Sequence, residues 1–317
     1  MNLSGRGVLL SLGASLLFAL ITVYVRLLAP LDGLQVFAQR VIWSIPAVLL
    51  LVLLSRQWPL LLDSLRRLRR EPWLLLVLPL CAVLVGVQWA LFVWAPLTGK
   101  MLDMSMGYFL LPLAMVLSGR IFYGERLSAL QQLAVLCALV GVGHEYLQTR
   151  SFSWVTLLVA LGYPPYFMLR RWIKLDALSG FALEILLMAP VAIWLIVAYG
   201  PPELYAQAPK MWWLLPGLGI LSALAFGAYM ASSRLLPMGL FGILSYSEPV
   251  LLFAVALLFL GESFSPSQLW TYLPIWLAVI LTGIDSGRLL HYQSRRGVCR
   301  IDQAGTDARR IRRGPRF

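Results

Sequence analysis

The sequence predicts an all-α integral membrane protein of ten transmembrane helices, arranged as two inverted five-helix repeats. Three observations support this prediction. Of the 317 residues, 60% are hydrophobic and 13% are charged, whereas a soluble domain is about 45–50% apolar and about 25% charged. The Lys and Arg residues lie between the apolar stretches. One stretch of the chain also occurs twice.

Ten stretches are long enough to cross a bilayer, which takes about 20 apolar residues. They lie at about 7–28, 34–54, 73–95, 101–122, 129–147, 152–169, 177–199, 212–233, 241–260 and 270–287. The first is too long for a cleavable signal peptide, and no small-residue cleavage site follows it, so we expect it to be a spanning helix.

The distribution of basic residues predicts that both termini are cytoplasmic. With the N-terminus inside, 21 of the 26 Lys and Arg residues fall on the cytoplasmic side, and Lys100, Arg150 and Lys210 fall outside. This asymmetry follows the positive-inside rule. The basic tail, 291–317, is expected to be disordered. Because the charges are spread between spans, the net charge of +12 does not indicate a nucleic-acid partner.

The repeated stretch runs from Met104 to Gln131, and a shift of 137 positions places it on Phe241 to Gln268. Each copy is predicted to begin in a Tyr-containing turn marked by Pro and to end at a polar Gly-Glu step that forms a structural turn. The alternative is chance similarity between apolar helices. The matched positions include Pro112 with Pro249, Gly124 with Gly261 and Glu125 with Glu262.

The repeat divides the chain into residues 1–147 and 148–290, with five spans each. An odd number of spans per half turns the second half upside down relative to the first. Inverted repeats of this kind build carriers whose central site opens alternately to each side of the membrane. The sequence therefore predicts a solute carrier embedded in the lipid bilayer.

Ionisable residues inside spans are the first candidates for function, because each costs at least ~2.5 kcal/mol at mid-membrane. Arg40 is predicted to bind or neutralise an anionic group, and Glu184 and Glu248 are candidate proton-coupling sites. The alternative is that all three extend to the membrane interfaces. Asp103, at a helix start, is expected to be an N-cap.

Aromatic residues are the second set of candidates. Trp43, Trp89, Tyr108 and Tyr246 are predicted to line the cavity, although Trp and Tyr also gather at membrane interfaces without a specific role. Pro164 and Pro165 cannot donate backbone hydrogen bonds, so a kink or hinge is expected in the sixth span.

Enzyme, cofactor and metal signatures are absent from the sequence. His144-Glu145 lacks the second His of a zinc-protease helix, and Gly99-Lys100 lacks the remainder of a phosphate-binding loop. The three Cys residues show no metal-ligand spacing. We therefore expect neither an enzyme nor a cofactor.

The chain resembles the RarD-type permeases of the EamA group, within the drug/metabolite transporter superfamily. The resemblance spans about residues 6–287. It is carried by Arg40-Val41-Ile42-Trp43-Ser44, Gln88-Trp89, Trp94-Ala95, Ser105 to Leu113, Gly124 to Leu127, Gly180 to Glu184, Tyr246, Glu248-Pro249 and Gly261-Glu262.

The resemblance implies a ten-helix secondary carrier of the bacterial inner membrane that exports a small organic metabolite or drug. It also places Gln88 among the substrate-binding residues. The chain departs from the family at four polar positions. The family usually has Asn at Gln88 and Leu111 and often near Leu97, and Thr at Ile185, so the solute can differ from those of relatives.

We therefore expect a proton-coupled exporter that works by alternating access. The alternative is a membrane-embedded binding or assembly protein without net transport. A wet, polar cavity between the halves would favour transport, and a packed apolar centre would favour the alternative. A homodimer is left open.

Overall fold

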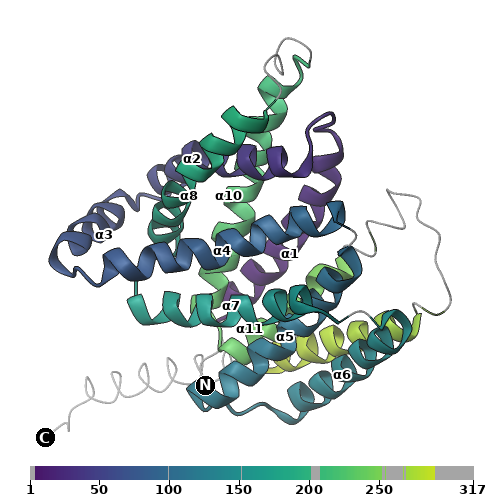
Figure 1. Cartoon of the computed structure of the whole chain (residues 1–317). Coiled ribbons are helices and arrows are strands. Elements are labelled where there is room, and N and C mark those ends of the chain that lie inside the picture. Colours follow the sequence, from purple (N-terminus) through teal and green to yellow (C-terminus); the bar gives the residue numbers. More distant parts are fainter. Residues whose placement is uncertain are drawn as a thin grey trace, which may run out of the picture.

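The computed structural model describes residues 4–98, 100–150, 152–200, 208–251, 254, 267 and 269–289. The described residues fold into helices joined by short connections (Figure 1). These are α1 Gly5–Arg26, α2 Gly33–Leu54, α3 Trp58–Arg70, α4 Leu74–Leu97, α5 Met101–Tyr123, α6 Ala129–Thr149, α7 Trp154–Ile173, α8 Ala177–Tyr199, α10 Met211–Leu235 and α11 Met238–Ser245. Residues 247–251 and Leu269–Leu289 are also helical.

The all-α membrane class is confirmed. Among the described residues, eight helices are long and apolar enough to cross a bilayer: α1, α2, α4, α5, α6, α8, α10 and Leu269–Leu289. The sixth predicted span coincides with α7, which is helical but is not one of the eight. The ninth, 241–260, extends beyond the described residues. The count of ten spans therefore stays a prediction.

Polar side chains fix where several helices begin. Ser4, Asp32, Ser128, Ser153 and Asp176 each accept a hydrogen bond from a backbone N–H in the first turn of α1, α2, α6, α7 and α8. Such caps satisfy amides that have no partner within the helix.

The helices pack around a core that is rich in aromatic residues. α1 and α2 pack against α10, α2 also packs against α8, and α7 lies between α4 and α5. Figure 1 shows α6 beside the C-terminal helix Leu269–Leu289, at the edge of the bundle, where Gln131 bonds Asp285. The largest fully buried side chains include Tyr166, Phe167 and Phe226.

The short helix α3 lies outside the main bundle (Figure 1). Its last turn is basic, and Trp58 and several Leu side chains along it are exposed, as in helices that lie along a membrane surface. Arg67 donates to both carboxylate oxygens of Glu71 at 3.0 Å, and this hydrogen bonding lowers the pKa of the Glu71 carboxyl.

The proline predictions are only partly correct. Tyr246 forms a turn that ends α11, three residues before Pro249, as predicted for the second copy of the repeat. In the first copy, α5 begins eleven residues before Pro112 and runs through it. Pro164 and Pro165 lie inside α7, which runs from Trp154 to Ile173, so the kink or hinge expected there stays a prediction.

The prediction for Asp103 is wrong as well. The N-cap of α5 is Lys100, so Asp103 lies within the first turn, where its Oδ2 is 3.2 Å from Lys100 Nζ. The predicted span, 101–122, begins at the same residue as α5, so only the assignment of the cap to Asp103 was wrong. An acidic residue in this turn still interacts favourably with the positive end of the helix dipole.

The first Gly-Glu step ties two helices together. Gly124 ends α5 with φ +61°, a left-handed conformation that suits Gly. Glu125 then accepts hydrogen bonds from the backbone N–H groups of Met238, at 2.6 Å, and Gly239, at 2.7 Å, in the first turn of α11. Arg171 of α7 lies 3.7 Å from the same carboxylate. The second step, Gly261-Glu262, lies outside the described residues.

Candidate functional site

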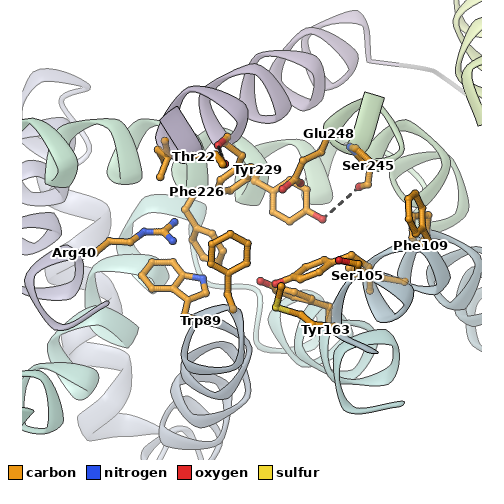
Figure 2. Close-up of a pocket in the computed structure, with 18 of the residues that line it drawn as sticks. Thr22, Arg40, Trp89, Ser105, Phe109, Tyr163, Phe226, Tyr229, Ser245 and Glu248 are labelled. Carbon is orange, nitrogen blue, oxygen red and sulfur yellow. Dashed lines mark hydrogen bonds between the residues drawn. The ribbon is translucent and has the colours of Figure 1, made fainter. Parts of the chain in front are cut away.

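The bundle encloses a cavity of about 370 Å³ (Figure 2). This volume lies at the lower end of the range for small-molecule sites, about 300–1,000 Å³. Helices from both halves of the chain contribute to it. The lining residues are Phe18, Ile21, Thr22, Arg40, Trp89, Phe92, Met104, Ser105, Tyr108, Phe109, Leu111, Pro112, Tyr163, Phe226, Tyr229, Ser245, Glu248, Pro249 and Tyr272.

Arg40 is held in a fixed position at the cavity wall. Its Nε donates to Ser222 Oγ at 2.9 Å, and its Cζ lies 4.1 Å from the ring centroid of Trp89. The Trp89 ring is itself fixed by edge-to-face contacts with Phe181 and Phe226. A guanidinium over a Trp face is stabilised by the ring quadrupole, so α2, α4 and α10 together orient this charge.

Glu248 brings a negative charge to the same cavity. It lies two residues after the turn at Tyr246, within the helical residues 247–251, and directly precedes Pro249. Its side chain is half-buried and lines the cavity. Within the described part of the chain, its carboxylate makes no hydrogen bond or ion pair. A carboxylate in this setting is available to a proton, to water or to a solute.

Aromatic side chains form most of the remaining wall. Tyr108 meets Phe92 edge-to-face with ring centroids 6.2 Å apart. Tyr229 Oη lies 3.3 Å from Ser245 Oγ, a contact drawn in Figure 2. Tyr163 and Tyr229 were missed by the sequence predictions, because nothing in a run of apolar residues separates an aromatic side chain of the cavity from one of the core.

Four predicted site residues meet at the cavity, namely Arg40, Trp89, Tyr108 and Glu248. Three others do not line it. Trp43 packs with apolar residues of α1 and α10, and the Gln88 amide donates to the Leu158 carbonyl at 2.8 Å.

The third of these, Tyr246, is 1% exposed and donates from Oη to the Phe109 carbonyl at 2.8 Å. Positions 109 and 246 differ by 137, which is the shift that aligns the repeated stretches. Tyr246 therefore contacts the residue that the predicted repeat aligns with it, and it does not line the cavity.

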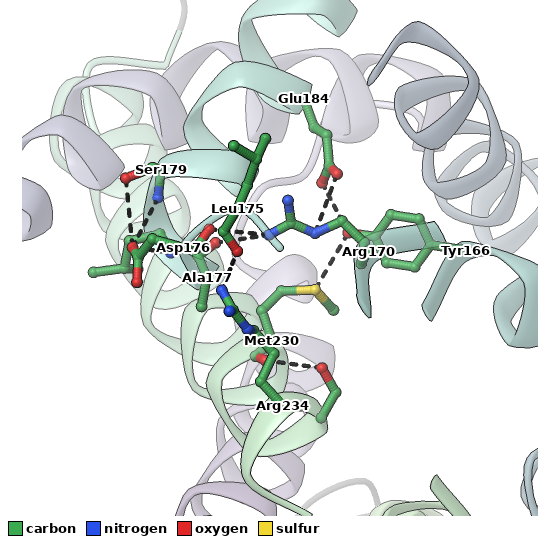
Figure 3. A network of polar contacts seen from close by, with 11 residues as sticks. Tyr166, Arg170, Leu175, Asp176, Ala177, Ser179, Glu184, Met230 and Arg234 are labelled. Atoms are coloured by element: carbon green, nitrogen blue, oxygen red, sulfur yellow. Dashed lines mark hydrogen bonds and ion pairs between the residues drawn. The ribbon is translucent and has the colours of Figure 1, made fainter. Parts of the chain in front are cut away.

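Glu184 belongs to a separate buried network (Figure 3). It is fully buried, accepts a hydrogen bond from Tyr166 Oη at 2.8 Å and lies 3.4 Å from Arg170 Nε. Arg170 is 3% exposed and donates to the carbonyls of Asp176 and Ala177. This pair fastens α7 to the start of α8. The predicted sixth span, 152–169, leaves Arg170 in the connection after it, whereas the structure buries this side chain within α7.

Comparisons with known proteins identify several relatives. The chain is 64% identical over 299 residues to the "Chloramphenicol-sensitive protein RarD" of Pseudomonas aeruginosa, covering 94% of this chain and 100% of that protein. It is 39% identical over 287 residues to an "Uncharacterized transporter" of Haemophilus influenzae, covering 90% and 96%. It is 32% identical over 284 residues to the "Protein RarD" of Salmonella typhimurium, covering 89% and 95%.

Two further comparisons bear on family and fold. No protein-family model matches the chain. A solved structure described only as "Crystal structure of protein" aligns with a TM-score of 0.65 at 18% identity, over 90% of this chain and 99% of that one. At this identity the likeness concerns the fold alone.

Proposed function

Because this chain belongs to the RarD family of membrane transporters, we propose that it exports a small organic solute by alternating access, driven by the proton gradient. That it is a multi-pass membrane transporter, and not an enzyme, follows from its relatives. The solute, the direction and the coupling ion are the proposed parts.

The observation that carries the proposal is the cavity that holds Arg40 and Glu248. A membrane protein without net transport predicts a packed apolar centre. Here a cavity of about 370 Å³ is lined by a cation, a carboxylate and several hydroxyl groups. Charged groups inside a membrane bundle usually mark a solute or ion pathway.

The spacing of the helices supports two repeats. α4 begins at Leu74 and α10 at Met211, and α5 begins at Met101 and α11 at Met238. Both pairs of starts are 137 residues apart, the same shift that aligns the repeated stretches. Repeat copies that keep this register imply duplication more strongly than chance similarity of apolar residues does.

The helix contacts also support two-fold related halves. If α1, α2, α4 and α5 correspond to α7, α8, α10 and α11, the contact of α1 with α10 has its counterpart in α7 with α4. The contacts of α2 with α10 and of α5 with α7 have theirs in α8 with α4 and α11 with α1. Rocking of one such half against the other would open the cavity alternately to each side.

Glu248 is the better candidate for proton coupling. Its carboxylate faces the cavity and lacks a partner within the described residues, whereas Glu184 is held by Tyr166 and Arg170. A carboxylate that binds either a proton or a solute group, but not both, couples proton transport to solute transport, because the two compete for one site. Glu184 is then assigned a structural role.

Two finer points remain part of the proposal. We place both termini in the cytoplasm of a bacterial inner membrane, from the distribution of Lys and Arg. Reporter fusions at the two ends would test this. A homodimer stays a prediction, and cross-linking in native membranes would test it.

Proteoliposomes loaded with a pH-sensitive dye test the transport proposal. Chloramphenicol, from the name of the Pseudomonas aeruginosa relative, and a fractionated metabolite extract serve as probe solutes. We expect proton flux on solute addition in the wild type and its loss in Arg40→Ala and Glu248→Gln. Arg69→Ala in α3 and Glu145→Gln at the end of α6 are matched controls. Wild-type flux in both cavity variants would remove Arg40 and Glu248 from the mechanism.

A further inference from the structure

The proposed function leaves the chemical class of the solute open, and the charges of the cavity narrow it. We infer that the solute is a small zwitterion with a flat apolar body. Its carboxylate would lie against Arg40, its ammonium group against Glu248 and its ring among the aromatic side chains. This inference rests on the proposed function, since it concerns the same cavity.

The cationic end of the cavity is built for a carboxylate. Arg40 donates a hydrogen bond from Nε to Ser222, and one face of its guanidinium stacks on the Trp89 ring. Its terminal nitrogens make no hydrogen bond or ion pair within the described residues, so the forked edge of the guanidinium remains available. That edge matches the two oxygens of a carboxylate. Because Ser222 and Trp89 fix the side chain, little conformational entropy is lost when an anion binds.

The anionic end suits an ammonium group. The Glu248 carboxylate lines the cavity together with the rings of Tyr163 and Tyr229. Aromatic faces around a carboxylate attract organic cations through the ring quadrupoles as well as through the charge. Figure 2 shows Arg40 and Glu248 entering the cavity from different helices.

The two charges do not neutralise each other. Among the described residues, no ion pair joins Arg40 to Glu248 within 4.0 Å, although both line one cavity. While Glu248 is ionised, a solute with a single charge would leave the opposite protein charge without a partner in a largely apolar space, which is costly. A zwitterion satisfies both charges at once and adds no net charge. The walls of Phe18, Phe92 and Phe226 then favour an apolar ring as its body.

Competition binding to the purified full-length protein in nanodiscs tests this class. Tritiated L-phenylalanine is the zwitterionic probe. The competitors are phenethylamine, which lacks the carboxylate, and 3-phenylpropionate, which lacks the ammonium group. We expect L-phenylalanine to bind about ten- to a hundred-fold more tightly than either competitor, the factor that one hydrogen bond to a charged group provides.

Two variants assign each charge to its end of the solute. In Glu248→Gln, L-phenylalanine should bind no more tightly than 3-phenylpropionate. In Arg40→Ala, L-phenylalanine should bind no more tightly than phenethylamine. Glu248→Gln should keep its affinity for 3-phenylpropionate, and Arg40→Ala should keep its affinity for phenethylamine. Retained binding also shows that each variant is folded. Glu145→Gln and Arg69→Ala should bind all three probes as the wild type does.

The inference is wrong if the wild type binds none of the probes or binds a singly charged probe as tightly as the zwitterion. The two experiments distinguish an error in the proposed solute class from an error in the transport proposal. If Arg40→Ala and Glu248→Gln abolish solute-driven proton flux but L-phenylalanine does not bind, transport stands and the zwitterion class falls. If L-phenylalanine binds as expected but no flux occurs, the transport proposal falls instead.

Discussion

Replacing Glu125 by Ala should loosen the start of α11 without touching the cavity. The Glu125 carboxylate accepts two backbone hydrogen bonds from Met238 and Gly239, at 2.6 and 2.7 Å. It also lies 3.7 Å from Arg171, whose guanidinium donates to the carbonyls of Ser233 and Leu236 at the end of α10. One side chain therefore connects the α5–α6 turn to α7 and α11.

The expected cost follows from these contacts. Each hydrogen bond to a charged group contributes about 1.5–3 kcal/mol, and a carboxylate at a helix N-terminus adds roughly 0.3–1 kcal/mol. The Glu125 side chain is 13% exposed, so water can replace part of what is lost. We therefore expect Glu125→Ala to lower the free energy of unfolding by about 2–4 kcal/mol. Glu125→Gln keeps one acceptor oxygen and should cost about half as much.

Thermal unfolding of the full chain in detergent, followed by tryptophan fluorescence, measures the effect. A loss of this size should lower the melting temperature by about 4–10 °C. Glu71→Ala is the matched control, because Glu71 pairs with Arg67 in a half-exposed contact within one helical turn and should change little. An added Cβ at Gly119 would lie 2.7 Å from Glu125 Oε2, so Gly119→Ala should reproduce the loss. Equal melting of Glu125→Ala and wild type would refute the reasoning.

Two further substitutions test contacts of the core by the same melting assay. An added Cβ at Gly180 would lie 1.6 Å from Arg170 Nη1, so Gly180→Ala should break the buried ion pair and lower the free energy of unfolding by about 3–5 kcal/mol. Gly143→Ala is the control, because a Cβ added there meets open space. Equal melting temperatures of these two variants would contradict the expected loss. Tyr246→Phe removes the hydrogen bond to the Phe109 carbonyl and should cost about 1 kcal/mol, whereas unchanged melting would show that this bond contributes nothing.

The helices, and two charged residues that line the cavity, could be predicted because polar groups are costly inside a membrane. The apolar stretches locate the helices, and an Arg or Glu within them must find a cavity or a partner. Arg40 and Glu248 line the cavity, and Glu184 found a partner in Arg170. The sequence could not tell these two outcomes apart, because they depend on which residues of other helices lie opposite.

The predictions were wrong or incomplete where tertiary packing decides which side chains are buried and which line the cavity. Arg170 lies one turn before the end of α7, and a boundary uncertain by a few residues turned a buried side chain into a loop charge. Phe226 and Tyr229 line the cavity, but their spacing is that of any core helix, so no sequence signal marks them.

The bond from Tyr246 to Phe109 bears on how such a chain could have diverged after duplication. Under the proposed duplication these two residues are each other's counterparts, so a pair of identical halves would bring two copies of the same residue to one spot. A fused chain escapes that constraint: one copy keeps Phe while the other gains a hydroxyl. Fusion of both copies in one chain thus permits an asymmetric contact between the halves, which two identical subunits could not form.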